Sequence, residues 1–220
     1  MKSTLVCKIV ALAAAGASLS AVPAFAGSDA FNRPKIGKQW VAVSGSIGIA
    51  NREYAGSTLS LSYLKTAASN TAATAVVRLG SNDLEYGAVA LGNIAGGNNA
   101  FIKIQSQDGS GTTFDDGAFY TGNNGSGTFF ALSSPLPTSP AVLDAYFCGT
   151  VAVMRITSAT GIQVYSLDYG TAYPSGAGLG TYGSVGLDNF IGFASACTDS
   201  LVGAIDAASL PKATDLSLAK

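Results

Sequence analysis

Apolar and polar residues alternate along the chain in short runs, a period of two that is typical of β-strands. The clearest run covers residues 58–64, where Leu59, Leu61 and Tyr63 are expected on one face and the intervening serines on the other. Similar runs predict further strands over residues 40–49, 75–79, 86–91, 101–105, 118–120, 128–132, 151–157, 162–167 and 184–193. Beyond the first 26 residues no long helical stripe is found, although residues 65–75 can hold one helical turn.

Segments rich in glycine, asparagine and aspartate separate these runs, as at residues 81–83, 96–99 and 108–111. Glycine adopts positive φ without strain and Asn and Asp tolerate it, so these segments suit turns. Thr160 and Gly161 are expected to form a tight hairpin between two alternating runs. About ten short strands separated by turns predict an all-β fold. The length suits a two-sheet antiparallel jelly-roll sandwich, which manages its strand edges.

The start of the chain has the pattern of a secretory signal peptide. Lys2 and Lys8 precede an apolar run over residues 9–22, and small residues around Phe25 predict cleavage after Ala26. No later apolar stretch approaches roughly 20 residues, so no membrane span is expected in the mature chain. An exported protein, secreted or periplasmic, is therefore expected. The expected divisions are a signal peptide (1–26), a lead-in (27–38), one sandwich domain (39–200) and a tail (201–220).

Charge is sparse and spread out, with 12 Lys and Arg, 13 Asp and Glu, and no histidine. Two of the lysines leave with the predicted signal peptide, so the mature chain has 10 basic and 13 acidic residues. Binding to a phosphate backbone or an anionic membrane needs clustered Lys and Arg. The sequence shows no such cluster, so nucleic acid and anionic membrane surfaces are not expected as partners.

The absence of histidine also limits catalysis, because Ser and Cys triads use a histidine base. Glycoside hydrolysis needs two carboxylates across one bond, and Glu53 and Glu85 fall in different predicted segments. The one adjacent pair, Asp115 and Asp116, lies in a turn-like stretch where solvated turn formers are the commoner explanation. The sequence therefore predicts a protein that is not an enzyme.

Cys148 and Cys197 remain after removal of the predicted signal peptide. An exported chain meets an oxidising compartment, so the two are expected to form a disulfide. The bridge would close a loop of about 50 residues and stabilise the fold by roughly 4 kcal/mol in the chain-entropy model. A zinc site is a poor alternative without histidine.

Tyr120, Asn123 and Asn124 form the first candidate binding site, for a carbohydrate. A tyrosine ring offers an apolar face and a polar tip, and the neighbouring amides can meet sugar hydroxyls. Tyr169, Tyr173 and Tyr182 lie in a loop-rich stretch that can form a second aromatic surface. The alternative is that all these rings only cover sheet edges.

Asp108, Asp115 and Asp116 form the second candidate site, for Ca²⁺, with Asn123 and Asn124 close by in sequence. Calcium takes six to eight oxygen ligands, which loop carboxylates, amides and carbonyls supply. The alternative is that these residues form turns around a short strand, because no EF-hand pattern is present. Calcium is thus the one candidate ion.

Segments 101–105, 117–124, 148–156, 165–170 and 186–190, taken in this order, resemble the concanavalin A-like or laminin-G-like jelly rolls of exported bacterial proteins. In such chains an Asp-Asn-Phe motif, here at residues 188–190, commonly belongs to the final strand. The resemblance is to the PEP-CTERM-associated type. Its C-terminal sorting tail is missing, because the last twelve residues lack an apolar segment and a basic end. Lectins, adhesion modules and glycan-cleaving enzymes share this fold.

Three hypotheses follow for the function. The first is a secreted, non-catalytic, lectin-like recognition module that binds an extracellular glycan or takes part in adhesion. The second is a structural protein that self-associates in an extracellular layer or matrix, which the low charge and high Gly and Ser/Thr content favour. A hydrolase with an unusual carboxylate pair is the last.

Overall fold

The computed structural model of the chain describes residues 25–56, 59–67, 71–78, 84–106, 113–122, 125–137, 140–173 and 175–193. Most of the predicted signal peptide and the predicted tail, 201–220, fall outside these ranges. Asp108, Asn123, Asn124 and Cys197 also lie outside the described residues.

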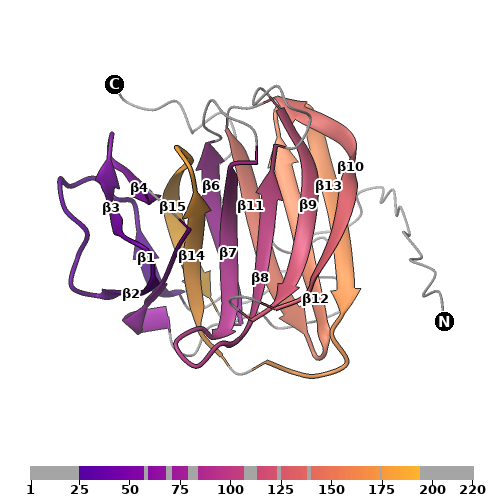
Figure 1. The fold of residues 1–220 in the computed structure, drawn as a ribbon, viewed down its shortest axis with the longest axis horizontal. Coiled ribbons are helices and arrows are strands. Elements are labelled where there is room, and N and C mark those ends of the chain that lie inside the picture. Colours follow the sequence, from indigo (N-terminus) through magenta and orange to yellow (C-terminus); the bar gives the residue numbers. More distant parts are fainter. Residues whose placement is uncertain are drawn as a thin grey trace, which may run out of the picture.

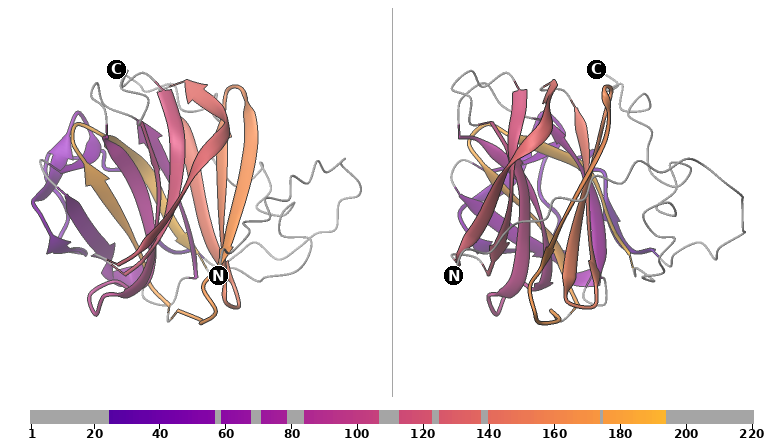
Figure 2. Two further views of the ribbon diagram at one scale, coloured as in Figure 1. Left: turned by 45° about the vertical axis from the view of Figure 1, so that its right-hand side comes forward. Right: turned by 90° about the vertical axis from the view of Figure 1, so that its right-hand side faces the viewer.

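Two antiparallel sheets lie face to face (Figures 1 and 2). In order, the eight-stranded sheet consists of β13 (Gly161–Asp168), β12 (Val151–Ser158), β11 (Ala141–Cys148), β6 (Ala72–Arg78), β15 (Gly186–Phe193), β4 (Glu53–Gly56) and β3 (Ile47–Ala50), with β1 (Phe25–Asp29) beside β15. The seven-stranded sheet consists of β10 (Gly127–Pro137), β9 (Thr113–Thr121), β8 (Asn98–Gln105), β7 (Tyr86–Asn93), β14 (Ala177–Tyr182), β5 (Ser60–Leu64) and β2 (Trp40–Ser44). The predicted all-β, two-sheet antiparallel jelly-roll sandwich is confirmed.

The main core lies between the sheets and is built by alternate residues of the central strands. Ile102 and Ile104 of β8 and Met154 and Ile156 of β12 are fully buried in it. Because successive strand residues point to opposite faces, Lys103 and the other residues between them lie on the outer faces. The alternation that predicted the strands therefore also decides which side chains the sandwich presents outward.

An aromatic cluster closes the core beside β15. Trp40 lies against Phe31, Tyr54 and Phe190, with ring centroids between 5.2 and 5.7 Å from that of Trp40. The indole Nε1 of Trp40 donates a hydrogen bond to Asp29 Oδ2 at 2.7 Å. Trp40 therefore belongs to the core, since it is buried in the main cluster.

The opposite end of the sandwich is joined by side chains from the two edge strands β10 and β13. Gln163 Nε2 donates to the carbonyl of Ser134 at 2.8 Å, and its Oε1 accepts from Ser133 Oγ at 2.6 Å. Tyr165 accepts from the amide of Ser133 at 2.7 Å. These bonds link the first strand of one sheet to the first strand of the other.

Each of the ten predicted strand segments overlaps an observed strand, whereas β1, β4, β11 and β14 were not predicted. The predicted hairpin joins β12 to β13, with Ser158 paired to Gly161, so its turn is at 159–160 rather than at Thr160-Gly161. The helical turn is a single 3₁₀ turn over Lys65–Ala67. No helix in the described ranges has the length and apolar character needed to cross a membrane.

The final strand departs from simple alternation at the Asp-Asn-Phe motif. Asn189 has a φ of 49°, and the pairing register of β15 with β6 shifts between Asp188 and Ile191. One extra residue in a strand reverses the faces that follow it. Leu187 and Phe190 therefore both face the core, whereas regular alternation would place Phe190 on the same face as Asp188.

Candidate functional site on the seven-stranded sheet

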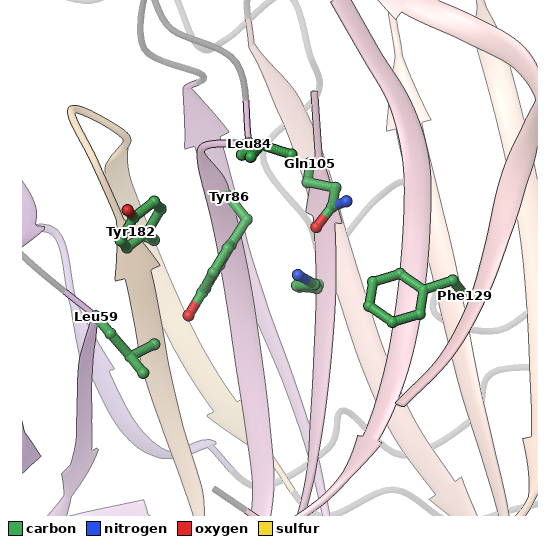
Figure 3. A pocket seen from close by; sticks show the side chains of 7 residues that line it. Leu59, Leu84, Tyr86, Gln105, Phe129 and Tyr182 are labelled. Atoms are coloured by element: carbon green, nitrogen blue, oxygen red, sulfur yellow. The ribbon is translucent and has the colours of Figure 1, made fainter. Parts of the chain in front are cut away.

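The outer face of the seven-stranded sheet holds an open depression of about 370 Å³. Figure 3 shows its side chains, which project from several neighbouring strands into one space. They are Leu59, Leu84, Tyr86, Lys103, Gln105, Phe129 and Tyr182. A second hollow of about 270 Å³ shares Leu59, Tyr86 and Lys103 with the first and adds Ser44, Leu61, Phe101, Tyr120 and Gly125. We call the two together the aromatic depression.

Pairs of aromatic rings line the aromatic depression. Tyr182 is stacked on Tyr86, with a centroid distance of 5.8 Å and an interplanar angle of 20°. Tyr120 meets Phe129 edge to face at 5.4 Å and 80°. Tyr182 and Phe129 remain 44% and 51% exposed, whereas Tyr86 is buried. Two exposed rings thus flank a floor made by a third.

Lys103 lies among these rings and is only 7% exposed. Its Nζ is 4.4 Å from the ring centroid of Tyr86, 5.1 Å from that of Tyr120 and 5.3 Å from that of Phe129. An ammonium within about 6 Å of a ring centroid is attracted by the negative face of the ring. Burial lowers the pKa of Lys103 from 10.5 to about 8, against the opposing effect of Asp116.

Asp115 and Asp116 were expected in a turn, and this is wrong: both lie within the strand β9. Burial raises the pKa of Asp116, and the charge of Asp115 raises it further, while Lys103 lowers it. Among the described residues no group of three or more His, Cys, Asp or Glu side chains could hold a metal ion. Since Asp108 lies outside the described ranges, the calcium site stays a prediction.

The candidate sugar-binding residues are only partly described. Tyr120 lines the aromatic depression, while Asn123 and Asn124 lie outside the described residues. The proposed second aromatic surface does not form as one unit. Tyr169 and Tyr173 contact Phe147 at the core, at centroid distances of 5.8 and 5.3 Å, and Tyr182 alone lines the aromatic depression.

Sequence reasoning missed Tyr86, Lys103, Gln105 and Phe129 as site residues. The signal for Lys103 was present, because it is one charged residue within an apolar run on β8. A charge at such a position is rarely buried without a reason.

The remaining candidate residues have structural partners. Glu53 accepts a hydrogen bond from Arg78 Nε at 2.6 Å, and Glu85 accepts one from the amide of Ser184 at 2.8 Å. The two glutamates therefore have different hydrogen-bonding partners, Arg78 and Ser184. Cys148 forms a disulfide. Because Cys197 lies outside the described residues, the pairing of these two cysteines stays a prediction.

No protein-family model and no curated protein matches the chain. Solved structures do. The carbohydrate-binding module CBM66 from Bacillus subtilis is 12% identical, with a TM-score of 0.54 over 69% of this chain and 93% of that one. The apo Crh5 transglycosylase is 12% identical, with a TM-score of 0.54 over 79% and 87%. The lectin UEA-II complexed with galactose is 9% identical, with a TM-score of 0.52 over 78% and 99%.

These identities show a shared fold and nothing finer. The resemblance noted in the sequence is confirmed at that level, because the chain has the jelly-roll sandwich of these binding modules and enzymes and is consistent with a concanavalin A-like fold. The PEP-CTERM-associated type stays a prediction.

Proposed function

We propose that the chain is an exported, non-catalytic module that binds glycans through the aromatic depression. The observation that carries the proposal is the pair of exposed rings, Tyr182 and Phe129, on either side of a hollow with Lys103 and Gln105 in its lining. Binding sites are typically concave and mostly apolar, with a few polar groups that fix orientation.

A sugar ring matches this surface chemically. Its C–H faces are apolar and lie flat on aromatic rings, while its hydroxyl groups at the rim need hydrogen-bonding partners. Tyrosine provides both an apolar ring and a polar tip. The Tyr86–Tyr182 stack presents two such tips from neighbouring strands, β7 and β14.

The structural neighbours support the same proposal. A carbohydrate-binding module and a lectin share this fold at low identity. A transglycosylase shares it too, so the non-catalytic part of the proposal rests on this chain's own residues. Glu53 and Glu85 each have structural partners, as described above, and the sequence has no histidine.

A self-associating structural protein is the second candidate, and exposed apolar residues on an edge strand favour it. Ile162 and Val164 lie on β13, which ends the eight-stranded sheet, and Ile162 is 59% exposed. An edge strand with exposed apolar residues can pair with another chain.

Glycan-array binding and affinity electrophoresis with soluble polysaccharides test the proposal. We expect at least one glycan to bind the wild-type chain, and Phe129→Ala to weaken that binding by about tenfold. Ile162→Ala is the matched control, at a similarly exposed apolar residue on the other sheet, and is expected to bind normally. Assembly that grows with concentration in light scattering, with no glycan bound at all, would support the second candidate instead.

A further inference from the structure

Among the residues that the structure describes, the ammonium of Lys103 forms no ion pair. It carries three N–H groups, which prefer oxygen lone pairs. Its in-register neighbours are Ala88 on β7 and Ala118 on β9, which offer no side-chain oxygen. Within the described ranges, no carboxylate forms an ion pair with Lys103. Three aromatic rings attract its charge but supply no strong hydrogen-bond acceptor.

The charged group is nevertheless within reach of a ligand. Lys103 lines both hollows of the aromatic depression, so a bound molecule can approach it. Burial of an unpaired charge is costly, and an anionic acceptor would recover part of that cost. A charge-assisted hydrogen bond to a carboxylate is roughly twice as strong as one to a neutral oxygen.

The surrounding rings restrict what carries the carboxylate. A small inorganic anion would pair with Lys103 but leave the exposed rings of Tyr182 and Phe129 without a contact. A sugar acid has both parts, namely an apolar ring face for the aromatic residues and a carboxylate for the lysine. The acidic group that acts on Lys103 is Asp116 of β9, whose own neighbour is Asp115.

Building on the proposed function, we propose that the aromatic depression selects glycans that contain uronic acids, with Lys103 as the group that binds the sugar carboxylate. Tyr86, Tyr120 and Phe129 hold the ammonium in place through cation–π contacts. Tyr182 and Phe129 then contact the faces of the sugar. Acidic glycans would bind more tightly than neutral ones of the same backbone.

The test compares polymers that differ only in charge. Polysaccharides of galacturonic acid, of mannuronic and guluronic acid, and of glucuronic acid are titrated into the full chain at pH 7 by calorimetry. Each is paired with its own carboxyl-reduced, neutral form. We expect at least one acidic polymer to bind about tenfold more tightly than its neutral form. Lys103→Met is expected to remove this preference, whereas Lys65→Met, a change at an exposed lysine outside the depression, keeps it.

Each outcome decides between the two proposals. Equal binding of acidic and neutral forms would overturn the selectivity and leave glycan binding standing. Absence of binding to any polymer, acidic or neutral, together with a blank glycan array, would overturn both. A preference for acidic polymers that persists in folded Lys103→Met would also reject the role of Lys103. If that variant does not fold, the wild-type comparison of acidic and reduced polymers still tests the selectivity.

Discussion

The two sheets each carry a buried cation on the outer face of a central strand, and the two cations have opposite surroundings. Arg155 on β12 faces Asp144 on β11 in register, with Nε and Oδ2 3.4 Å apart. Lys103 on β8 faces an alanine on each side. One sheet provides a carboxylate for its cation, and the other provides aromatic rings.

This difference separates a structural charge from one suited to binding. Burial raises the pKa of Asp144 to about 6, while Thr74 and Arg155 act to lower it. Arg155 thus has its carboxylate partner within the eight-stranded sheet, in an ion pair. Lys103 forms no ion pair with a carboxylate of the described residues, and in the proposal above a ligand supplies its oxygen partner. A buried charge that has its partner within the protein bears on the stability of the fold. A charge that lines a hollow and has no partner among the described residues is a candidate for ligand recognition.

The largest expected effect is a loss of stability when the ion pair of Arg155 and Asp144 is broken. Asp144→Ala leaves Arg155 buried without its carboxylate, so we expect a loss of about 3–5 kcal/mol in the free energy of unfolding. Urea denaturation measures it. Adding Arg155→Met removes the orphaned charge and should recover most of the loss. A loss below about 1 kcal/mol in the single variant would show that the pair is not the structural unit described here.

The next largest effect is expected when Lys103 is given a carboxylate partner within the protein. Ala118→Asp places a carboxylate in register with Lys103, as Asp144 is with Arg155. The internal acid should occupy the ammonium and weaken polyuronate binding by about tenfold, or about 1.4 kcal/mol. Ala118→Asn has nearly the same shape without the charge and should retain more of the binding. Equal losses in the two variants would indicate a steric effect and argue against the pairing.

A smaller effect on polyuronate binding is expected from a change of pH. The pKa of Lys103 is about 8, so raising the pH from 7 to 8.5 deprotonates most of the ammonium and should weaken polyuronate binding about fourfold. Asp116 is the acid whose charge acts on Lys103, and its negative charge opposes an anionic ligand. Burial raises the pKa of Tyr86, which therefore stays neutral over this range. Calorimetry at the two pH values measures the change, and Lys103→Met should show none.

The contrast between the sheets also shows what the sequence could predict. Period-two alternation is a local property of the chain, so it located eleven of the described strands and indicated the sandwich. Which face of a strand is buried depends on the layer stacked against it. Residues 58–64 illustrate this, because Leu61 lies on the outer face while Ser60 and Ser62 are buried, with Ser62 donating to Tyr54.

The same limitation concealed the site. Leu61 of β5 and Tyr86 of β7 are large side chains on alternating strands, yet they border the aromatic depression and lie outside the main core cluster. Tyr86, Lys103 and Phe129 come from β7, β8 and β10, which belong to one run of consecutive antiparallel strands. Tyr182 joins them only through the pairing of β14 with β7, which are distant in sequence. Only the assembled sheet brings them together. Tyr120 could be proposed from its local sequence because polar turn residues follow it directly.

The smallest expected effect is on the stability of the fold when Lys103, rather than Asp144, is replaced. Lys103→Met should change the free energy of unfolding by less than about 1 kcal/mol, because cation–π attraction and the cost of burying the charge largely offset each other. Methionine keeps the apolar stem, and its sulfur makes favourable aromatic contacts. Urea denaturation at pH 7 beside Asp144→Ala provides the direct test. If Lys103→Met were as destabilising as Asp144→Ala, Lys103 would be a structural residue, and the distinction between the two cations would fail.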